Sequence, residues 1–258
     1  MVEQQATPNE NNAFPVIRQI KVHNILLWLQ SGLNDLRQAK LSSLFYGAVF
    51  ASAGLLMHAV LFEASWLLSA LTTGFLLVGP FLAMGLYDLS RRIELGEPPS
   101  LIPSLFCWRN NLINVGIFAG LLVVVLLVWA RASLVIFAIF FQGGLPSFMD
   151  IVQAVFAFKQ PTFALVYFAV GGFFAAFVFS ISIIAIPLMA DRNTDAVTAA
   201  IASLITVVRN PLPMLLWAIT IVSLVALGFA THFIGLIFTM PIIGHASWHA
   251  YRDLVSPA

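Results

Sequence analysis

The chain has 258 residues, of which 60% are apolar and only 9% are charged, against about 45–50% and about 25% in soluble domains. This composition excludes a water-soluble fold. With 12 basic and 11 acidic residues the formal net charge is +1, so the chain offers neither a basic face for nucleic acid nor an acidic tail. Cys107 is the single cysteine, which excludes an intrachain disulfide or a cysteine-based metal cluster within one copy.

The N-terminal residues are polar and lack the apolar core of a secretory signal. Residues 1–20 are therefore predicted to form a disordered cytoplasmic tail, followed by a single integral membrane domain over residues 21–258. A helix needs about 20 apolar residues to cross the hydrocarbon core of a bilayer, and the domain contains several uncharged intervals of that length. The last interval is about twice as long, so it is expected to fold back on itself near residues 228–235.

These intervals predict an all-α fold, a polytopic transmembrane helical bundle of about six spans in three hairpins. The predicted spans are residues 41–62, 66–89, 110–131, 162–190, 211–230 and 233–252.

Basic residues lie almost entirely on one side of these spans. Lys159 is on the opposite side, and Arg131 is near or within the third span. Because Lys and Arg are enriched in cytoplasmic loops, both termini are predicted to be cytoplasmic. The residues that give this bias are Arg18, Lys21, Arg37, Lys40, Arg91, Arg92, Arg109, Arg192, Arg209 and Arg252.

Three connecting segments have apolar residues at helical spacing, as in amphipathic helices that lie in the membrane interface. Trp28 is predicted to anchor the first of them at the headgroup level. Such helices can rest at the headgroups or can form a docking surface for a partner, and the pattern fits both. The stripes are Ile25, Leu29, Gly32, Leu33 and Leu36, then Val197, Ile201, Leu204 and Val208, and on the outer side Phe148, Ile151, Val152 and Val155.

Histidines are the candidates for haem or metal ligands. His245 and His249 are four residues apart on one helix face and could share a metal, although interfacial hydrogen bonding with Trp248 and Tyr251 is the favoured explanation. His58 and His232 are expected at similar depth, so they are weak candidates for a haem. No third metal ligand and no CxxCH haem-attachment motif accompany them, and the prediction is that the chain carries no cofactor.

Arg131 is the charged residue whose depth the sequence leaves open. If the third span begins near Trp108, Arg131 reaches the outer interface, where its side chain can extend to water. If the span instead covers about 117–141, the guanidinium lies deep and requires a partner. Glu63 and Asp150 are then the candidate partners.

A structural cluster is expected where spans two and six reach the cytoplasm, just beyond Pro80 and Pro241. Within it, Asp88 is predicted to pair with Arg252. The residues of this cluster are Tyr87, Asp88, His245, His249, Tyr251, Arg252 and Asp253.

Enzyme signatures are missing from the sequence. It contains no GxSxG elbow, phosphate-binding loop, HExxH motif or dinucleotide fingerprint. Asp88 lies at the cytoplasmic end of the second predicted span, and no acidic residue falls deeper inside any of the spans, which removes the usual carboxylate relay of proton-coupled transporters. The chain is therefore expected not to be an enzyme.

Several segments along the chain form a recognisable set. They include Ser43-Leu44-Phe45-Tyr46-Gly47, Gly79-Pro80-Phe81, Tyr87-Asp88-Leu89-Ser90-Arg91, Asn210-Pro211-Leu212-Pro213-Met214 and Gly244-His245-Ala246-Ser247-Trp248-His249. Through these segments the chain resembles a family of predicted bacterial integral membrane proteins of unknown function, some of which carry a cytochrome c oxidase label. The resemblance implies a bacterial inner membrane, and it transfers no mechanism. Catalytic oxidase activity is rejected, because such a subunit requires twelve helices and intramembrane histidines.

The leading hypothesis is a non-enzymatic accessory, assembly or stabilising factor for a membrane complex, which could be a respiratory one. Its expected partners are the lipid bilayer and either another membrane complex or further copies of itself, without nucleic acid. The alternatives are a small-solute transporter or channel and a haem-binding redox subunit.

Overall fold

The computed structural model describes residues 14–61, 79, 82–141 and 159–256, and within these ranges the regular elements are helical. This confirms the all-α fold class. The elements are α1 Asn24–Gln38, α2 Lys40–Leu61, a helix over 82–94, α4 Leu101–Leu105, the 3-10 helix η2 Cys107–Asn111, α5 Leu112–Phe140, α7 Pro161–Ser182, α8 Ala185–Arg192, α9 Ala196–Arg209, α10 Pro211–Ala230 and α11 Leu236–Leu254.

Among the described residues, four helices are long and apolar enough to cross a membrane: Lys40–Ala59, Leu101–Phe140, Pro161–Arg192 and Pro211–Ala230. They correspond to predicted spans one, three, four and five. The second predicted span, 66–89, falls largely outside the described residues, and α11 is not among the four. The count of six spans therefore stays a prediction.

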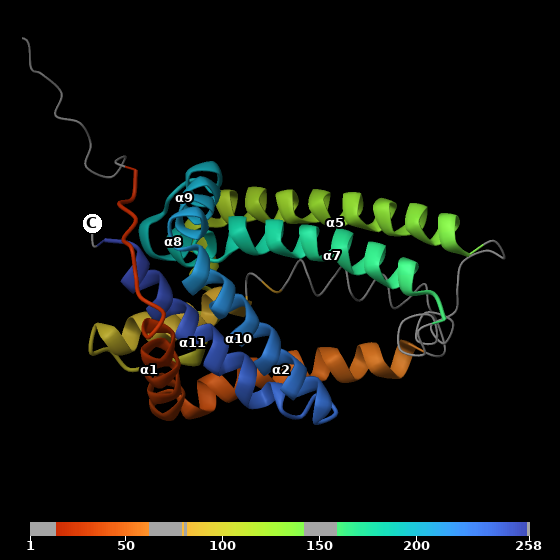
Figure 1. The fold of residues 1–258 in the computed structure, drawn as a ribbon. Coiled ribbons are helices and arrows are strands. Elements are labelled where there is room, and N and C mark those ends of the chain that lie inside the picture. The colour runs from red at the N-terminus through yellow and green to blue at the C-terminus, as the bar shows by residue number, and fades with distance from the viewer. Residues whose placement is uncertain (1–13, 62–78, 80–81, 142–158, 257–258) are drawn as a thin grey trace, which may run out of the picture.

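The helices form two groups (Figure 1). In one, α5 lies beside α7; in the other, α11 lies between α1, α2 and α10, which all pack against it. Because its neighbours are protein rather than lipid, α11 is buried along most of its length and carries polar residues that a lipid-facing helix could not tolerate.

A proline and a glycine bring α11 and α2 into close contact. Pro241 inside α11 lacks an N–H, so the carbonyl of Ile237 one turn earlier loses its helical hydrogen bond. That carbonyl lies against Gly47 of α2, where an added Cβ would overlap its oxygen. The contact leaves room for a Cα–H to approach the freed carbonyl, and only glycine fits there.

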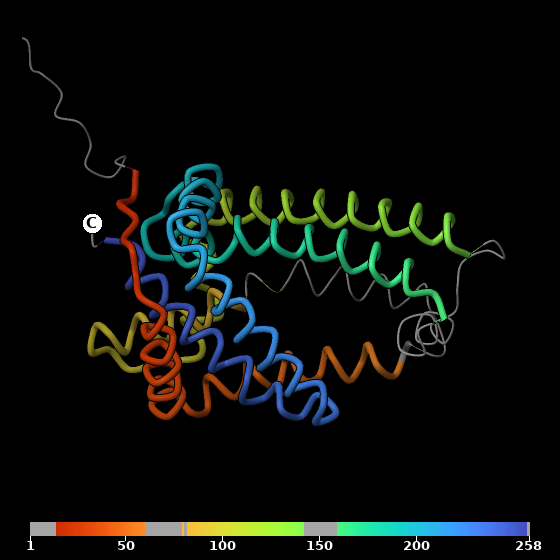
Figure 2. Tube along the Cα trace, viewed as in Figure 1, coloured from red at the N-terminus to blue at the C-terminus, as the bar shows by residue number. Residues whose placement is uncertain are grey.

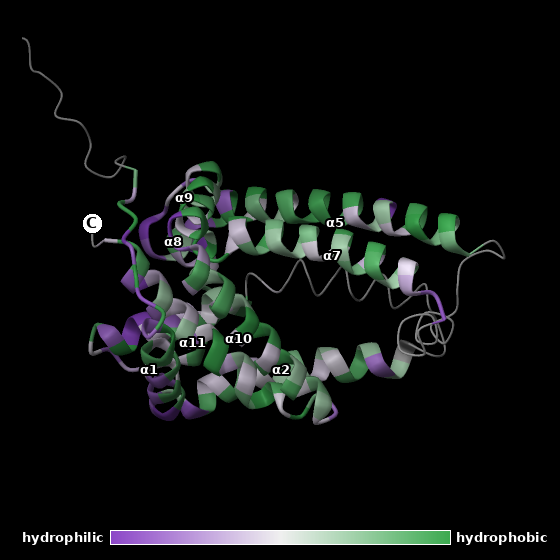
Figure 3. Ribbon diagram, viewed as in Figure 1, coloured by the Kyte–Doolittle hydropathy of each residue, from purple (hydrophilic) through white to green (hydrophobic). Residues whose placement is uncertain are grey.

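Hydrophilic residues gather at the end of the molecule that holds α1, α8, α9 and the last turns of α11, here called the polar end (Figure 3). The first described residues run beside the C-terminus there (Figure 2). Ile17 forms an isolated bridge with Val255, and the Arg18 N–H donates to the Leu254 carbonyl at 2.8 Å. Residues 14–20 are thus held by backbone pairing, unlike the disordered tail expected for this part of the chain; residues 1–13 lie outside the described ranges.

Helix α9 confirms the second amphipathic stripe and shows how it is oriented. Its small residues, Ala199, Ala202 and Ser203, are fully buried, and Ser203 accepts from the backbone N–H of Ile184. Its large apolar residues point outward, with Val208 71% exposed. The face that needs an apolar environment is therefore turned away from the protein.

The structure of helix α1 corrects the prediction made from the first amphipathic stripe. Trp28 is only 2% exposed and packs edge-on against Trp217 of α10, with ring centroids 5.5 Å apart. It is part of the core and not a headgroup anchor, because α1 packs along α11 instead of floating at the interface. The third stripe, at 148–155, lies outside the described residues.

We predict that Gly47→Ala destabilises the protein by about 2 kcal/mol, because the new methyl group forces α2 away from the Ile237 carbonyl. Chemical unfolding in mild detergent, followed by helical circular dichroism, measures the change. The matched control is Gly172→Ala in α7, where an added Cβ meets nothing within 4 Å and helix propensity alone favours alanine. An equal loss in both variants would contradict the contact.

Candidate functional site

A continuous chain of hydrogen bonds crosses the polar end around His245. Its Nε2 lies 2.8 Å from the Ser43 Oγ of α2, and its Nδ1 lies 2.7 Å from the Ser90 Oγ of helix 82–94. Ser90 donates to the Asp35 carboxylate of α1 at 2.7 Å, and His249 Nε2 contacts the same oxygen at 2.8 Å. The chain therefore joins four helices through buried polar groups.

The network fixes the tautomer of His245. Ser90 has one hydroxyl hydrogen and gives it to Asp35, so its oxygen must accept from Nδ1–H of His245. The Nε2 of neutral His245 is then an acceptor for the Ser43 hydroxyl. We assign this tautomer because it satisfies each of these groups, which their burial requires.

A serine hydroxyl beside an imidazole nitrogen is also the arrangement of a nucleophile and its base. Here Ser43 and His245 both have 0% exposure, enclosed where α2 packs on α11. A substrate cannot reach the hydroxyl without separating these helices. The arrangement is suited to holding helices together rather than to covalent catalysis.

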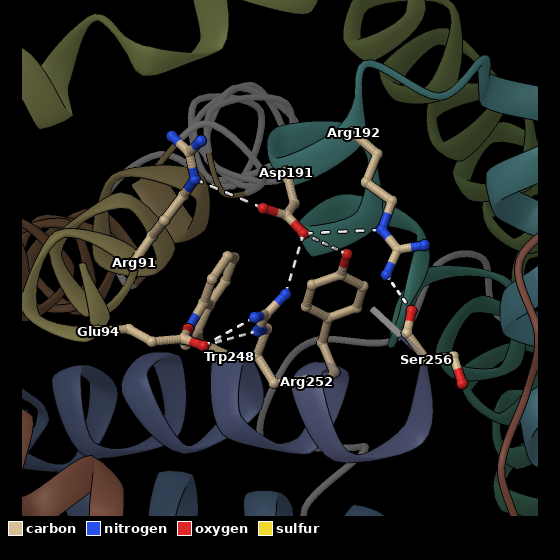
Figure 4. Close-up of polar contacts among 8 residues, drawn as sticks. Arg91, Glu94, Asp191, Arg192, Trp248, Arg252 and Ser256 are labelled. Carbon is tan, nitrogen blue, oxygen red and sulfur yellow. Dashed lines mark hydrogen bonds and ion pairs between the residues drawn. The ribbon is translucent and has the colours of Figure 1, made fainter. Parts of the chain in front are cut away.

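A second set of contacts centres on the carboxylate of Asp191 in α8 (Figure 4). The Tyr251 hydroxyl donates to it at 2.6 Å. Three guanidinium nitrogens lie within 4 Å, at 3.4 Å from Arg91, 3.6 Å from Arg252 and 3.8 Å from Arg192. One carboxylate thus links helix 82–94, α8 and α11.

Glu94 completes this set from the other side of Arg252. Its carboxylate accepts from Arg252 Nη2 at 2.8 Å and Nε at 3.0 Å, and from the Trp248 indole N–H at 3.1 Å. Arg252 is therefore bidentate to one oxygen of Glu94 and also faces Asp191. Arg192 in turn donates to the carbonyl of Ser256, which ties the C-terminal residues to α8.

The predicted pairing of Asp88 with Arg252 is not what the structure shows. Asp88 accepts from Arg92 of its own helix at 2.7 Å, and this bond raises the pKa of the Arg92 guanidinium. Arg252 pairs with Glu94 and Asp191 instead. Glu94 lies six residues after Asp88, about 1.7 turns along the helix and about 120° around it. Which of the two faces Arg252 therefore depends on how helix 82–94 is rotated against α11.

Other predicted cluster residues have separate partners. Tyr87 is buried and hydrogen-bonded to Ser247. Asp253 accepts from the Asn24 side-chain amide at 2.6 Å and from the Trp28 indole N–H at 3.0 Å. The expected cluster is thus divided into several local contacts that all join α11 to its neighbours.

The weak haem candidates lie at the far end of the α2 and α10 helices. The His58 ring is 5.8 Å from the ring of Phe233, and His232 sits in the turn between α10 and α11 with a left-handed φ of 53°. Within the described ranges, no group of three His, Cys, Asp or Glu side chains is arranged to hold a metal ion. His245 and His249 are instead occupied by serine and aspartate oxygens.

Arg131 lies inside α5, which begins at Leu112 and extends through Phe140, so the depth of its side chain stays a prediction. Its side chain is exposed. The candidate partners Glu63 and Asp150 lie outside the described residues.

Sequence reasoning missed Asp35, Ser43, Ser90, Glu94 and Asp191. The serines have no distinctive spacing, and Asp35 sits in an amphipathic pattern that marks it as solvent-facing. Glu94 and Asp191 could have been suspected from their arginine-rich neighbours, although nothing local shows that both meet Arg252. Their roles arise from contacts between residues about 60 to about 210 positions apart.

We predict that His245→Ala costs about 3 kcal/mol of unfolding free energy. The change leaves the Ser43 and Ser90 hydroxyls without their imidazole partner and opens a cavity in α11. Detergent-phase chemical unfolding measures it, with exposed His23→Ala as the control, expected to change stability by less than about 0.5 kcal/mol. Equal effects of the two substitutions would show that the network does not stabilise the fold.

We also predict that a double-mutant cycle couples Arg252 to Glu94 but not to Asp88. Glu94→Gln with Arg252→Gln should give a coupling free energy of about 0.5 kcal/mol, since both side chains are partly exposed. Asp88→Asn with the same Arg252 change should give none within error. Coupling to Asp88 as large as that to Glu94 would restore the pairing predicted from sequence.

Comparison with known proteins gives one family match. The family is described as a predicted integral membrane protein (DUF2189), and its model matches residues 67–191. No curated protein and no solved structure matches the chain significantly. The matched segment contains helix 82–94, α5 and α7, and it ends at Asp191. Through this segment the resemblance to a family of predicted integral membrane proteins is confirmed, and the chain is an integral membrane protein.

Proposed function

We propose that the chain is a non-enzymatic factor that acts by lateral association, assembling or stabilising another complex in a bacterial inner membrane. The distribution of basic residues supports a cytoplasmic location for the polar end and both termini. The polar groups there are engaged with one another, as in the His245 chain and the Asp191 contacts. Such a site supports a structural role better than a catalytic one.

The observation that carries the proposal is the α5–α7 hairpin. Its helices have 29 and 22 residues, pack against each other, and meet the rest of the described chain mainly at η2, α8 and α9. Along the remainder they expose large apolar side chains, among them Ile139, Leu165 and Phe173, each at least 67% exposed. A hairpin fixed at one end and apolar along its sides is suited to packing beside another membrane protein.

An apolar groove between the two helices adds to this surface. It has a volume of about 440 Å³ and is lined by side chains without charge, including Leu126, Trp129, Phe174 and Val178. Gly171 keeps it open beside the Trp129 ring. Such a groove accepts a lipid tail or an apolar side chain.

The proposal predicts that the protein, extracted in mild detergent from its own membranes, has a native mass that is not a multiple of its 28.2 kDa chain, because another subunit adds to it. Native mass spectrometry measures the mass, and tandem dissociation identifies the added subunit. The control is the same chain produced in excess, where free protein should outnumber its partner. Recovery as the bare chain or a homo-oligomer, with no partner captured by crosslinking, would contradict lateral association with another complex.

A further inference from the structure

The outward face of α5 has a regular seam. Residues 113, 117, 120, 124, 127 and 131 follow one another at alternating spacings of four and three, which places them in one line along the helix. Ile113, Val124 and Leu127 are 77%, 56% and 58% exposed. The opposite side of α5, with Phe118 and Ala119, is buried in the protein. The spacing of the exposed line is that of a helix which packs against a second helix.

Near the polar end, two exposed glycines on α5 allow a second helix to approach it closely. Gly116 and Gly120 are exposed, and a Cβ added to either would meet nothing within 4 Å. Elsewhere in the protein, glycines such as Gly47 and Gly32 lie directly against a neighbouring backbone. The two α5 glycines offer the same kind of surface without an occupant among the described residues.

The other half of the seam carries a charge. Arg131 belongs to the exposed line, and nine more helical residues, 132–140, follow it. They extend about 14 Å, and the 19 helical residues before Arg131, from Leu112 to Ala130, extend about 28 Å. Arg131 makes no ion pair or hydrogen bond with the described part of the chain. A guanidinium that stands in the apolar exposed face of a membrane helix finds its favourable partner in a carboxylate of a neighbouring helix.

We propose that the outward face of α5 binds a transmembrane helix of a different membrane protein, which places small residues opposite Gly120 and a carboxylate opposite Arg131. The inference rests on the proposed lateral association and specifies its surface and partner. The carboxylate lies about 16 Å beyond the small residues along the partner helix, since 11 residues separate Gly120 from Arg131.

Charge complementarity disfavours a second copy of the chain as the occupant. Two copies inserted in the same direction would bring their α5 helices together in parallel, with Arg131 facing Arg131 at equal depth. Like charges in a medium of low dielectric constant repel strongly. If the second helix instead carries an acidic residue opposite Arg131, the same geometry gives a favourable ion pair.

The test uses the full chain in its own membranes, with a photoreactive amino acid at Val124. The control position is Val222 on α10, which is similarly exposed at 67%. We expect an adduct from Val124 to a protein with an acidic residue in a transmembrane helix, and none from Val222. Arg131→Glu should abolish the adduct, and changing the partner's carboxylate to lysine should restore it.

Gly120→Leu tests the close approach independently. It should also abolish the adduct while unfolding stability is unchanged, because the space above Gly120 is open within the chain. Gly172→Leu in α7 is the matched control, with equally open space on another helix, and should retain the adduct.

Four results would overturn the inference. Adducts from Val222 but not from Val124 would agree with lateral association and would reject the outward face of α5 as its surface. An adduct only to a second copy would assign the face to a homodimer. Rescue of Arg131→Glu by Glu63→Arg or Asp150→Arg would identify a partner within the chain. No adduct from either position, together with a bare chain in the mass spectrum, would reject the proposed function as well.

Discussion

The burial of α11 among other helices is the constraint on which the rest of the structure depends. A membrane helix surrounded by protein can carry histidine, serine and tryptophan polar groups, provided that each finds a partner. His245 at its centre meets this condition through Ser43 and Ser90, which belong to two other helices. The positions of α2 and helix 82–94 are therefore set by where their hydroxyls must lie.

The same constraint accounts for the close helix packing. Hydrogen bonds of 2.7–2.8 Å between short side chains require backbones that approach closely. Gly47 and Gly32 permit this approach to α11, and the carbonyl of Ile237, which Pro241 frees from its helical hydrogen bond, fits the space at Gly47. Small residues at the crossings and polar groups between them thus act together, since neither would be stable without the other.

How far the sequence predicts this arrangement follows from the same physics. Uncharged length predicts helices such as α10 with accurate ends, because lipid enforces one requirement on every turn. Amphipathic periodicity fails for Trp28, because a helix anchored at the headgroups and a helix packed on α11 have the same pattern. It also fails for the choice between Asp88 and Glu94 as partner of Arg252, which depends on the rotation of one helix against another. Periodicity identifies which face of a helix is apolar. The residues that this face contacts depend on the geometry with which two helices cross.

The polar end and helix α5 differ in whether their charged side chains have partners. At the polar end each carboxylate meets a guanidinium, an indole, a hydroxyl or an amide, and Asp191 alone faces three arginines. In α5 the opposite holds, since Arg131 stands in an apolar exposed line and leaves its charge uncompensated among the described residues. Under the proposed lateral association, a contact from outside completes this charge, and the packing of α5 and α7 on α8 and α9 holds the hairpin in position for it.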